Sequence, residues 1–331
     1  MAKSIASELT KMSNELRAGN RQALARAITL VESTRHDHRE TAEQLIATLL
    51  ANTGRTVRLG ISGPPGVGKS TFIESLGSYL VGNEHKIAVL AVDPSSTKGH
   101  GSVLGDKTRM PKLSQTENVF IRPSPSGGAL GGVSRRTREA VLVCEAAGYD
   151  VIMVETVGVG QSETTVRDMV DMFILLAQPA SGDELQGIKR GVVEIADLVV
   201  VNKADGELLS AARRTQSDYS NALQLFRAPT TDWSTPVLTC SALYDQGIRE
   251  IWQTVEQYCV IMEKNGSLSG LRRQQAIAWM WSEIRDTLNE KFRSAPIVAK
   301  RISDIERKVS NGHLAPTTAA KSLLSDFLNE I

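Results

Sequence analysis

The chain has 331 residues, of which 41% are hydrophobic, 23% charged and only 5% aromatic. This composition supplies a sizeable core and excludes a wholly disordered chain. The 38 Lys and Arg residues balance 37 Asp and Glu residues to a net charge of +1. Bulk charge therefore argues against general binding to nucleic acid or to an anionic membrane.

The cysteines and the apolar runs indicate in which cellular compartment the protein is expected. The three cysteines lie far apart and none forms a Cys-x-x-Cys pair, which argues against a disulfide framework and a thiolate zinc site. No apolar run approaches the roughly 18 residues of a membrane span, and the N-terminus lacks the apolar core of a signal peptide. We expect a cytoplasmic protein that does not enter a membrane.

Residues 1–52 show the spacing of amphipathic helices. Apolar residues recur every three or four positions, which is the period of one helix face. The first such stripe consists of Ile5, Leu9, Met12 and Leu16. Asn52, Thr53 and Gly54 then interrupt the pattern. We predict an N-terminal helical extension that covers the domain that follows.

Residues 53–262 alternate short apolar runs with helical stretches. The runs are almost continuously apolar, which is typical of strands covered on both faces, and they predict an α/β domain with a mostly parallel sheet. The expected strands are residues 57–61, 87–92, 151–154, 172–177, 198–201 and 236–239. Residues 94–118 form a long polar loop of the kind that is usually functional.

Residues 263–331 are predicted to be helical, after a linker at Asn265 and Gly266. An apolar stripe on the first long helix consists of Ile277, Trp281, Ile284 and Leu288. Such a unit adds no strand to the sheet, so its apolar face must pack elsewhere. We expect it to pair with a second copy of the chain in a homodimer; packing on the sheet domain is the alternative.

The strongest motif follows the first expected strand. It matches the phosphate-binding pattern G-x-x-x-x-G-K-[ST] and consists of Gly63, Pro64, Pro65, Gly66, Val67, Gly68, Lys69 and Ser70, followed by Thr71. Glycines let backbone N–H groups converge on phosphate oxygens, and the next helix adds its positive end. We expect Lys69 to be an exposed loop cation that reaches the β- and γ-phosphates, and the Ser70 hydroxyl to bind Mg²⁺.

Three carboxylates are candidates for the same magnesium site. Glu155 ends the third apolar run, where an acid on a neighbouring buried strand is expected beside the metal. Asp93 ends the second run and Asp106 lies in the loop beyond it. Spacing alone leaves open whether these two aspartates join the metal or are solvated loop residues. Gly158 could let the backbone approach the γ-phosphate and leave after hydrolysis.

A base-reading motif, N-K-x-D, follows the fifth run and consists of Asn202, Lys203 and Asp205. A carboxylate at Asp205 can accept from both the N1–H and the N2 amine of guanine. Adenine offers neither donor there, so ATP would leave a charge unpaired. The loop Ser241, Ala242 and Leu243 is suited to supporting the base. The bound nucleotide is therefore expected to be GTP or GDP, in a P-loop GTPase domain.

Six motifs together resemble the methylmalonyl-CoA mutase-associated GTPases, also called the MeaB/ArgK type. They are residues 63–71, 92–97, 105–110, 155–161, 183–187 and 202–205. The resemblance covers nearly the whole chain. It implies a G-protein chaperone that hydrolyses GTP to GDP and phosphate with Mg²⁺. The expected client is an adenosylcobalamin-dependent methylmalonyl-CoA mutase, whose cofactor loading and protection it gates, and the C-terminal helices hold the homodimer.

The resemblance also implies residue roles. Ser70, Asp93, Asp106 and Glu155 match the magnesium-site residues of the family. Residues 156–165 match a second switch and residues 178–189 a third, in which Lys189 is a candidate coupling residue. On this basis the catalytic candidates are Lys69, Glu155 and Lys189. Gln161 lies near the place of a water-positioning group, but the sequence does not assign that role.

Two other functions compete with this one. A metal-insertion GTPase would carry a Cys and His metal site, whereas the three cysteines and five histidines here are scattered. A nucleotide-dependent kinase serving transport would need a substrate pocket and no guanine-selective loop, and nothing here resembles a protein-kinase catalytic loop.

Overall fold

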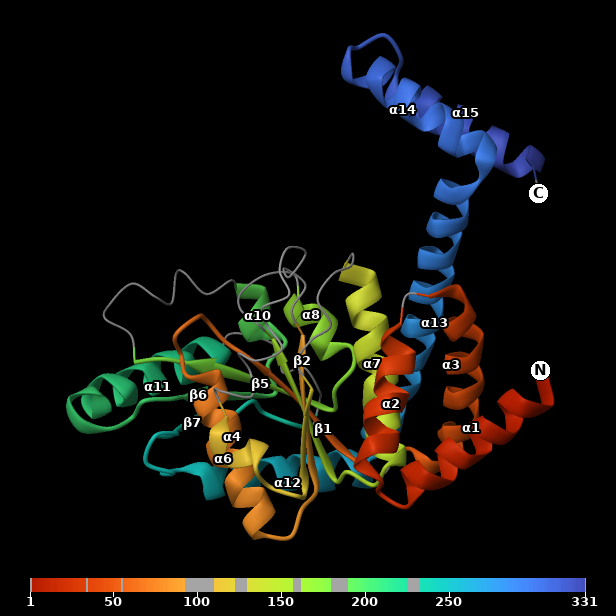
Figure 1. Ribbon diagram of the computed structural model, residues 1–331. Coiled ribbons are helices and arrows are strands. Elements are labelled where there is room, and N and C mark those ends of the chain that lie inside the picture. Colours follow the sequence, from red (N-terminus) through yellow and green to blue (C-terminus); the bar gives the residue numbers. More distant parts are fainter. Residues whose placement is uncertain are drawn as a thin grey trace. The chain divides into compact units, whose positions relative to one another are not determined.

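The computed structural model describes residues 2–33, 35–54, 56–92, 110–122, 130–156, 162–179, 190–224 and 232–330 (Figure 1). The chain divides into two compact units, Met1–Gln275 and Ala276–Ile331. Among the described residues, no helix is both long enough and apolar enough to cross a membrane.

In the described part of the first unit, one sheet of seven parallel strands runs in the order β3-β2-β4-β1-β5-β6-β7. The strands are β1 (Val57–Ser62), β2 (Ile87–Val92), β3 (Val119–Arg122), β4 (Val151–Thr156), β5 (Met172–Ala177), β6 (Leu198–Val201) and β7 (Val237–Thr239). The parallel α/β fold expected from the continuous apolar runs is confirmed. Because all strands are parallel, the phosphate-loop and base-reading motifs leave the sheet at the same edge.

Strand β3 is absent from the sequence-based prediction. It pairs only with β2, at the edge of the sheet, and its four residues lie between two polar, glycine-containing segments. A strand this short carries too little periodic signal to stand out. Strand β4 runs two residues beyond the expected 151–154, to Thr156, and Glu155 lies near its carboxyl end, as expected.

Every strand except β1, whose apolar side chains all face the second core, divides its side chains between two buried cores. On β4, for example, Ile152 and Val154 belong to one core, while Val151 and Met153 belong to the other. The first core is closed by α7 (Leu130–Ala146), α8 (Ser162–Arg167), α10 (Arg190–Glu194) and α11 (Leu209–Gln224). The second is closed by α4 (Lys69–Gly82), α6 (Pro111–Ser114) and α12 (Ile248–Lys264). Helices on both faces explain why the strands are apolar on both sides.

The N-terminal helices are α1 (Ala2–Arg17), α2 (Arg21–Glu32) and α3 (His36–Leu49), followed by the short turn η1 (Leu50–Asn52). They join the first core and pack beside α7 (Figure 1). Asn20 caps α2, because its side-chain oxygen accepts from the backbone N–H groups of Gln22 and Ala23, each over 2.9 Å. An ion pair between Glu32 and Arg122 ties α2 to the end of β3. The expected helical extension is thus part of the first unit.

A short break at Asn265 and Gly266 precedes α13 (Ser267–Ser294). Within the first unit, Arg272 of α13 donates to both carboxylate oxygens of Asp171, over 2.8 and 2.6 Å. The same guanidinium donates to the Gly54 carbonyl oxygen over 2.6 Å. This side chain therefore joins the beginning of α13 to the amino edge of the sheet.

The second unit contains the later part of α13, then α14 (Pro296–Ser310) and α15 (Pro316–Glu330). Its small core consists of Val298, Ile305, Ala319 and Leu323. The predicted stripe on α13 is not covered: Ile277 is 57% exposed, Trp281 53% and Leu288 54%. Among the described residues of the second unit, this stripe is therefore left largely uncovered.

Candidate functional site: a nucleotide-binding edge

The phosphate loop connects the end of β1 to α4, and its backbone requires glycine. Gly66 and Gly68 have φ angles of 79° and 93°, which L residues rarely adopt. A Cβ atom on Gly68 would lie 2.8 Å from Nδ2 of Asn202, and one on Gly63 would lie 2.5 Å from the Leu176 carbonyl oxygen. The loop therefore lies directly against the residues at the ends of β5 and β6.

Lys69 is the first residue of α4 and is half-buried, so the expectation of an exposed cation is wrong. Its ammonium donates to the carbonyl oxygens of Gly63 at 2.8 Å and Pro64 at 3.3 Å. The physical reason is that a three-donor cation folds back onto the acceptors of its own loop. Pro65 and Thr71 are exposed and Pro64 is half-buried. The Lys69 ammonium consequently lies directly beside the backbone that would surround a phosphate.

Ser70 and Glu155 come together from different elements, as expected for a shared magnesium site. The Ser70 hydroxyl donates to Oε1 of Glu155 over 3.4 Å, and Glu155 is 8% exposed. Next to them, the Thr156 hydroxyl donates to the Ser62 hydroxyl over 2.9 Å. Hydroxyl and carboxylate oxygens are the ligand types that Mg²⁺ prefers, so this pair fits the ion. The magnesium role stays a prediction.

Asn202 connects the base-reading motif to the phosphate loop. Its Nδ2 donates to the Val67 carbonyl oxygen over 2.9 Å, and its Oδ1 accepts from the Ala242 backbone N–H over 3.0 Å. Burial raises the pKa of the Cys240 thiol to about 12, so this thiol stays protonated and donates to the same Oδ1 over 3.4 Å. One buried side chain thereby holds three segments together.

Asp205 is held by the supporting loop that the sequence indicated. The Ser241 hydroxyl donates to Oδ2 of Asp205, and the Ala204 backbone N–H donates to the Cys240 carbonyl oxygen over 2.9 Å. Lys203 has a φ of 59°, and its side chain is half-buried. Ala242 is buried, whereas Leu243 is 69% exposed. The two loops expected to surround a guanine base are adjacent; their binding roles stay predictions.

Several predicted residues lie outside the described part of the chain. They are Asp93, Asp106, Gly158, Gln161 and Lys189. Of the two expected switches, residues 156 and 162–165 and residues 178–179 are described. Within the described ranges, no cluster of three or more His, Cys, Asp or Glu side chains could hold a metal ion.

One contact at this edge was not indicated by any motif. The Ser75 hydroxyl on α4 donates to Oδ1 of Asp245 over 2.5 Å, across 170 positions of sequence. Asp245 lies in the turn that follows Ser241–Ala242–Leu243. The composition of residues 245–247, Asp-Gln-Gly, is typical of a turn. It does not predict that the turn contacts α4.

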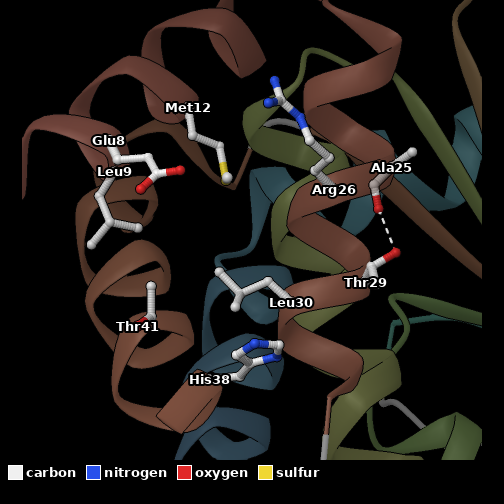
Figure 2. Close-up of a pocket in the computed structure, with 9 residues that line it drawn as sticks. All are labelled: Glu8, Leu9, Met12, Ala25, Arg26, Thr29, Leu30, His38 and Thr41. Carbon is white, nitrogen blue, oxygen red and sulfur yellow. Dashed lines mark hydrogen bonds between the residues drawn. The ribbon is translucent and has the colours of Figure 1, made fainter. Parts of the chain in front are cut away.

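A hollow of about 510 Å³ is lined by residues of α1, α2 and α3 (Figure 2), none of which belongs to these motifs. Leu9, Met12 and Leu30 are among the apolar side chains that line it. The Thr29 hydroxyl on its wall donates to the Ala25 carbonyl oxygen over 2.8 Å, as Figure 2 shows. The residues that line this hollow include no glycine loop at a helix N-terminus. The candidate phosphate-binding site is therefore the one at the edge of the sheet.

The whole-chain pattern matches one family of proteins. The family model described as methylmalonyl Co-A mutase-associated GTPase MeaB matches residues 24–297. This range contains the phosphate loop, the β4 carboxylate and the base-reading motif.

Individual relatives match over almost the full chain. A Mycobacterium tuberculosis protein named as a probable GTPase is 52% identical over 95% of this chain and 93% of its own length. The mouse protein named methylmalonic aciduria type A homolog, mitochondrial, is 50% identical over 93% of this chain and 77% of its own length. A crystal structure titled LAO/AO transport system kinase is 39% identical, with a TM-score of 0.78 and 98% of both chains covered.

Proposed function

The chain belongs to the family of methylmalonyl-CoA mutase-associated GTPases, MeaB, and from that premise we propose that it is a chaperone for a cobalamin-dependent mutase. It binds GTP, hydrolyses it to GDP and phosphate, and gates adenosylcobalamin loading and protection of a methylmalonyl-CoA mutase-type enzyme. The observation that carries the nucleotide part is the Asn202 side chain, which bonds the phosphate loop and the base-supporting loop at once.

The phosphate end of the proposed site is built from backbone N–H groups and one cation. The N–H groups of residues 66–70 surround the phosphate oxygens, and the positive end of α4 favours their charge. Lys69 exchanges its contacts with the Gly63 and Pro64 carbonyl oxygens for contacts with the β- and γ-phosphates. That exchange keeps the ammonium hydrogen-bonded in both states.

The base end of the proposed site selects guanine through Asp205. Its carboxylate accepts from N1–H and the N2 amine, while the bond from Ser241 fixes its orientation. With adenine, the same carboxylate would face the N1 acceptor and would find no donor at C2. A buried polar group left unpaired in this way discriminates strongly between ligands. The stem of Lys203 lies along the ring while its ammonium stays solvated.

Mg²⁺ would be held by the Ser70 hydroxyl and by the Glu155 carboxylate, directly or through water. Asp93 and Asp106 are further candidate ligands. When bound there, the ion would supply positive charge that neutralises the charge developing on the transferred phosphoryl group. Ser70 and Glu155 supply oxygen donors on two rigid elements, α4 and β4.

The client half of the proposal rests on the family. Hydrolysis can act on a partner only if the partner binds the GTP and GDP forms with different affinity. Residues 94–118, 156–165 and 178–189 are the proposed carriers of that difference, because in the sequence they continue from the carboxyl ends of β2, β4 and β5. Lys189 is the proposed coupling residue. The family description, methylmalonyl Co-A mutase-associated GTPase, supports a mutase client, as does the mouse relative, a methylmalonic aciduria type A homolog.

We also propose a homodimer formed by residues 263–331. The support is the exposed stripe of Ile277, Trp281, Ile284 and Leu288 on α13. Removing such side chains from water is worth roughly 1.5–3 kcal/mol each.

The test uses the purified protein with a purified cobalamin-dependent acyl-CoA mutase. We expect the mutase to accelerate GTP hydrolysis, and nucleotide state to alter adenosylcobalamin uptake by the mutase, because linkage is reciprocal. Lys189→Ala should weaken the acceleration more than it weakens nucleotide binding. Equal mutase affinity for the GTP and GDP forms with unchanged turnover would refute the chaperone role. Phosphoryl transfer from GTP to a transport protein would favour the kinase role instead.

A further inference from the structure

The turn that supports the base is tied to the helix that carries the phosphate loop. Ser75 lies on the second turn of α4, six residues after Lys69, and its hydroxyl donates to Asp245 over 2.5 Å. Ser75 is 6% exposed, whereas Asp245 is exposed to solvent. A buried hydroxyl thus finds its acceptor on a surface turn.

The backbone at Asp245 is in a conformation that glycine adopts more easily. Its φ is 56°, and Gly247, two residues later, has a φ of 79°. The left-handed region costs an L residue free energy that glycine does not lose. At Gly247 a Cβ atom would lie 2.6 Å from the Thr239 carbonyl oxygen, so only glycine fits there. At Asp245 the chain has a side chain instead, and that side chain makes the bond to α4.

The same turn is fixed at its other end to the base-reading motif. Ser241 and Gln246 exchange two backbone hydrogen bonds of 3.0 Å each. The Ser241 hydroxyl bonds the Asp205 carboxylate, and the Ala242 N–H bonds Asn202. Residues 241–246 therefore form one closed unit with three external attachments, of which the bond to Ser75 is the one that reaches α4.

We infer that Asp245 is a positioning residue for base recognition. Through Ser75 it fixes the turn of residues 241–246, and through Ser241 the turn fixes the direction of the Asp205 carboxylate. The inference rests on the proposed guanine-binding function. Its consequence is specific: loss of the Asp245–Ser75 bond weakens the contact that Asp205 makes with the guanine N2 amine.

The experiment measures equilibrium binding of GDP and of inosine diphosphate, which lacks the N2 amine, to the full-length protein. Asp245→Gly removes the carboxylate without adding backbone strain, because glycine adopts the φ of 56° easily. Ser75→Ala removes the other partner, and Asp245→Asn retains an acceptor for the Ser75 hydroxyl. Glu250→Gln is the matched control, since it neutralises an exposed carboxylate at the start of α12.

Asp245→Gly and Ser75→Ala should each weaken GDP binding about fivefold and inosine diphosphate binding less than about twofold. The preference for GDP over inosine diphosphate should therefore fall in both variants. Asp245→Asn should restore most of the preference, and Glu250→Gln should retain it. The Ser75→Ala and Asp245→Gly double variant should lose no more than either single variant, because both remove the same bond.

An unchanged preference in the two variants would overturn the inference, as would equal weakening of both nucleotides together with a lower melting temperature. The wild-type protein separates this failure from that of the proposed function. If the wild type prefers GDP over ADP and the variants retain their full preference over inosine diphosphate, only the role of Asp245 is wrong. If the wild type binds ADP as tightly as GDP, the guanine-binding function itself is wrong.

Discussion

Asn202 donates a hydrogen bond to the Val67 carbonyl oxygen over 2.9 Å, across 135 positions of sequence. The bond is buried, and a buried donor without a partner costs roughly 1–3 kcal/mol. The phosphate loop and the base-reading motif are therefore parts of one rigid edge. A nucleotide that contacts both ends would meet a site whose spacing is already set.

The first prediction concerns Lys69. Lys69→Ala should lower GTP hydrolysis by about 100-fold or more, because a cation facing the β- and γ-phosphates is lost. The fold should persist, since the ammonium donates to the Gly63 and Pro64 carbonyl oxygens of its own loop and lies outside the buried core. Turnover and melting temperature are both measured. Lys86→Ala, which removes an exposed lysine before β2, is the control. Hydrolysis near the wild-type rate in Lys69→Ala would exclude the phosphate-cradle assignment.

The second prediction concerns the choice of base. Asp205→Asn should weaken GTP binding by at least about 100-fold, because an amide cannot accept two donors as a carboxylate does. The same variant should gain affinity for xanthosine triphosphate, whose C2 carbonyl can accept from the amide N–H. A competition titration against labelled GDP measures both changes. Unchanged binding of both nucleotides would mean that Asp205 does not contact the base.

The third prediction is a pH dependence at a buried ion pair. Burial raises the pKa of Asp197 to about 6, although Arg167 lies 3.2 Å away and favours ionisation. The folded state therefore binds a proton that the unfolded state has released. The contribution of Asp197 to stability is greatest below its ordinary pKa of 3.8 and falls as the pH rises towards 6.

Asp197→Asn tests this dependence, because Asn can still accept from the Phe173 N–H that Asp197 bonds over 2.8 Å. Between pH 4 and about 6, the wild type should lose on the order of 1–3 kcal/mol relative to the variant. Melting temperatures of both proteins across this range give the measurement. A wild type that gains stability relative to the variant as the pH rises would show that the Arg167 pair outweighs burial.

The fourth prediction concerns the oligomer. Trp281→Glu should give a monomer that still binds nucleotide. Trp281 is 53% exposed within an apolar stripe of α13, so the new glutamate would place a charge in the proposed interface. Asp286→Lys, on the opposite side of the same helix, is the control and should leave the dimer intact. Sedimentation equilibrium distinguishes the two states. A wild-type monomer, or a Trp281→Glu variant that still dimerises, would refute the proposed interface.

Local sequence patterns were sufficient for the elements with strong periodicity. Continuous apolar runs predicted six strands and the parallel sheet, and the two nucleotide motifs predicted which loops would meet at its edge. Strand β3 was missed because four apolar-rich residues at a sheet edge carry little signal. The exposure of Lys69 was predicted wrongly. The motif predicts that Lys69 binds phosphate, but it does not predict which atoms of the loop Lys69 contacts without nucleotide.

The long-range polar contacts could not be predicted from the sequence, for a different reason. Ser75 and Asp245 are separated by 170 positions, and Arg272 bonds Asp171 across 101 positions. Each residue alone has the composition of an ordinary helix face or turn. Their pairing depends on which elements pack together, so only the folded arrangement identifies it.

The most direct measurement compares GTP and ATP hydrolysis by the wild-type protein at equal Mg²⁺ concentration. Because Asn202 joins the phosphate loop to the guanine-reading loop, both ends of the nucleotide should be recognised together. We predict that kcat/KM for GTP exceeds that for ATP by at least about 100-fold, and that Asp205→Asn removes most of this preference. Equal kcat/KM for the two nucleotides would contradict the assignment of this edge as a guanine-specific GTPase site.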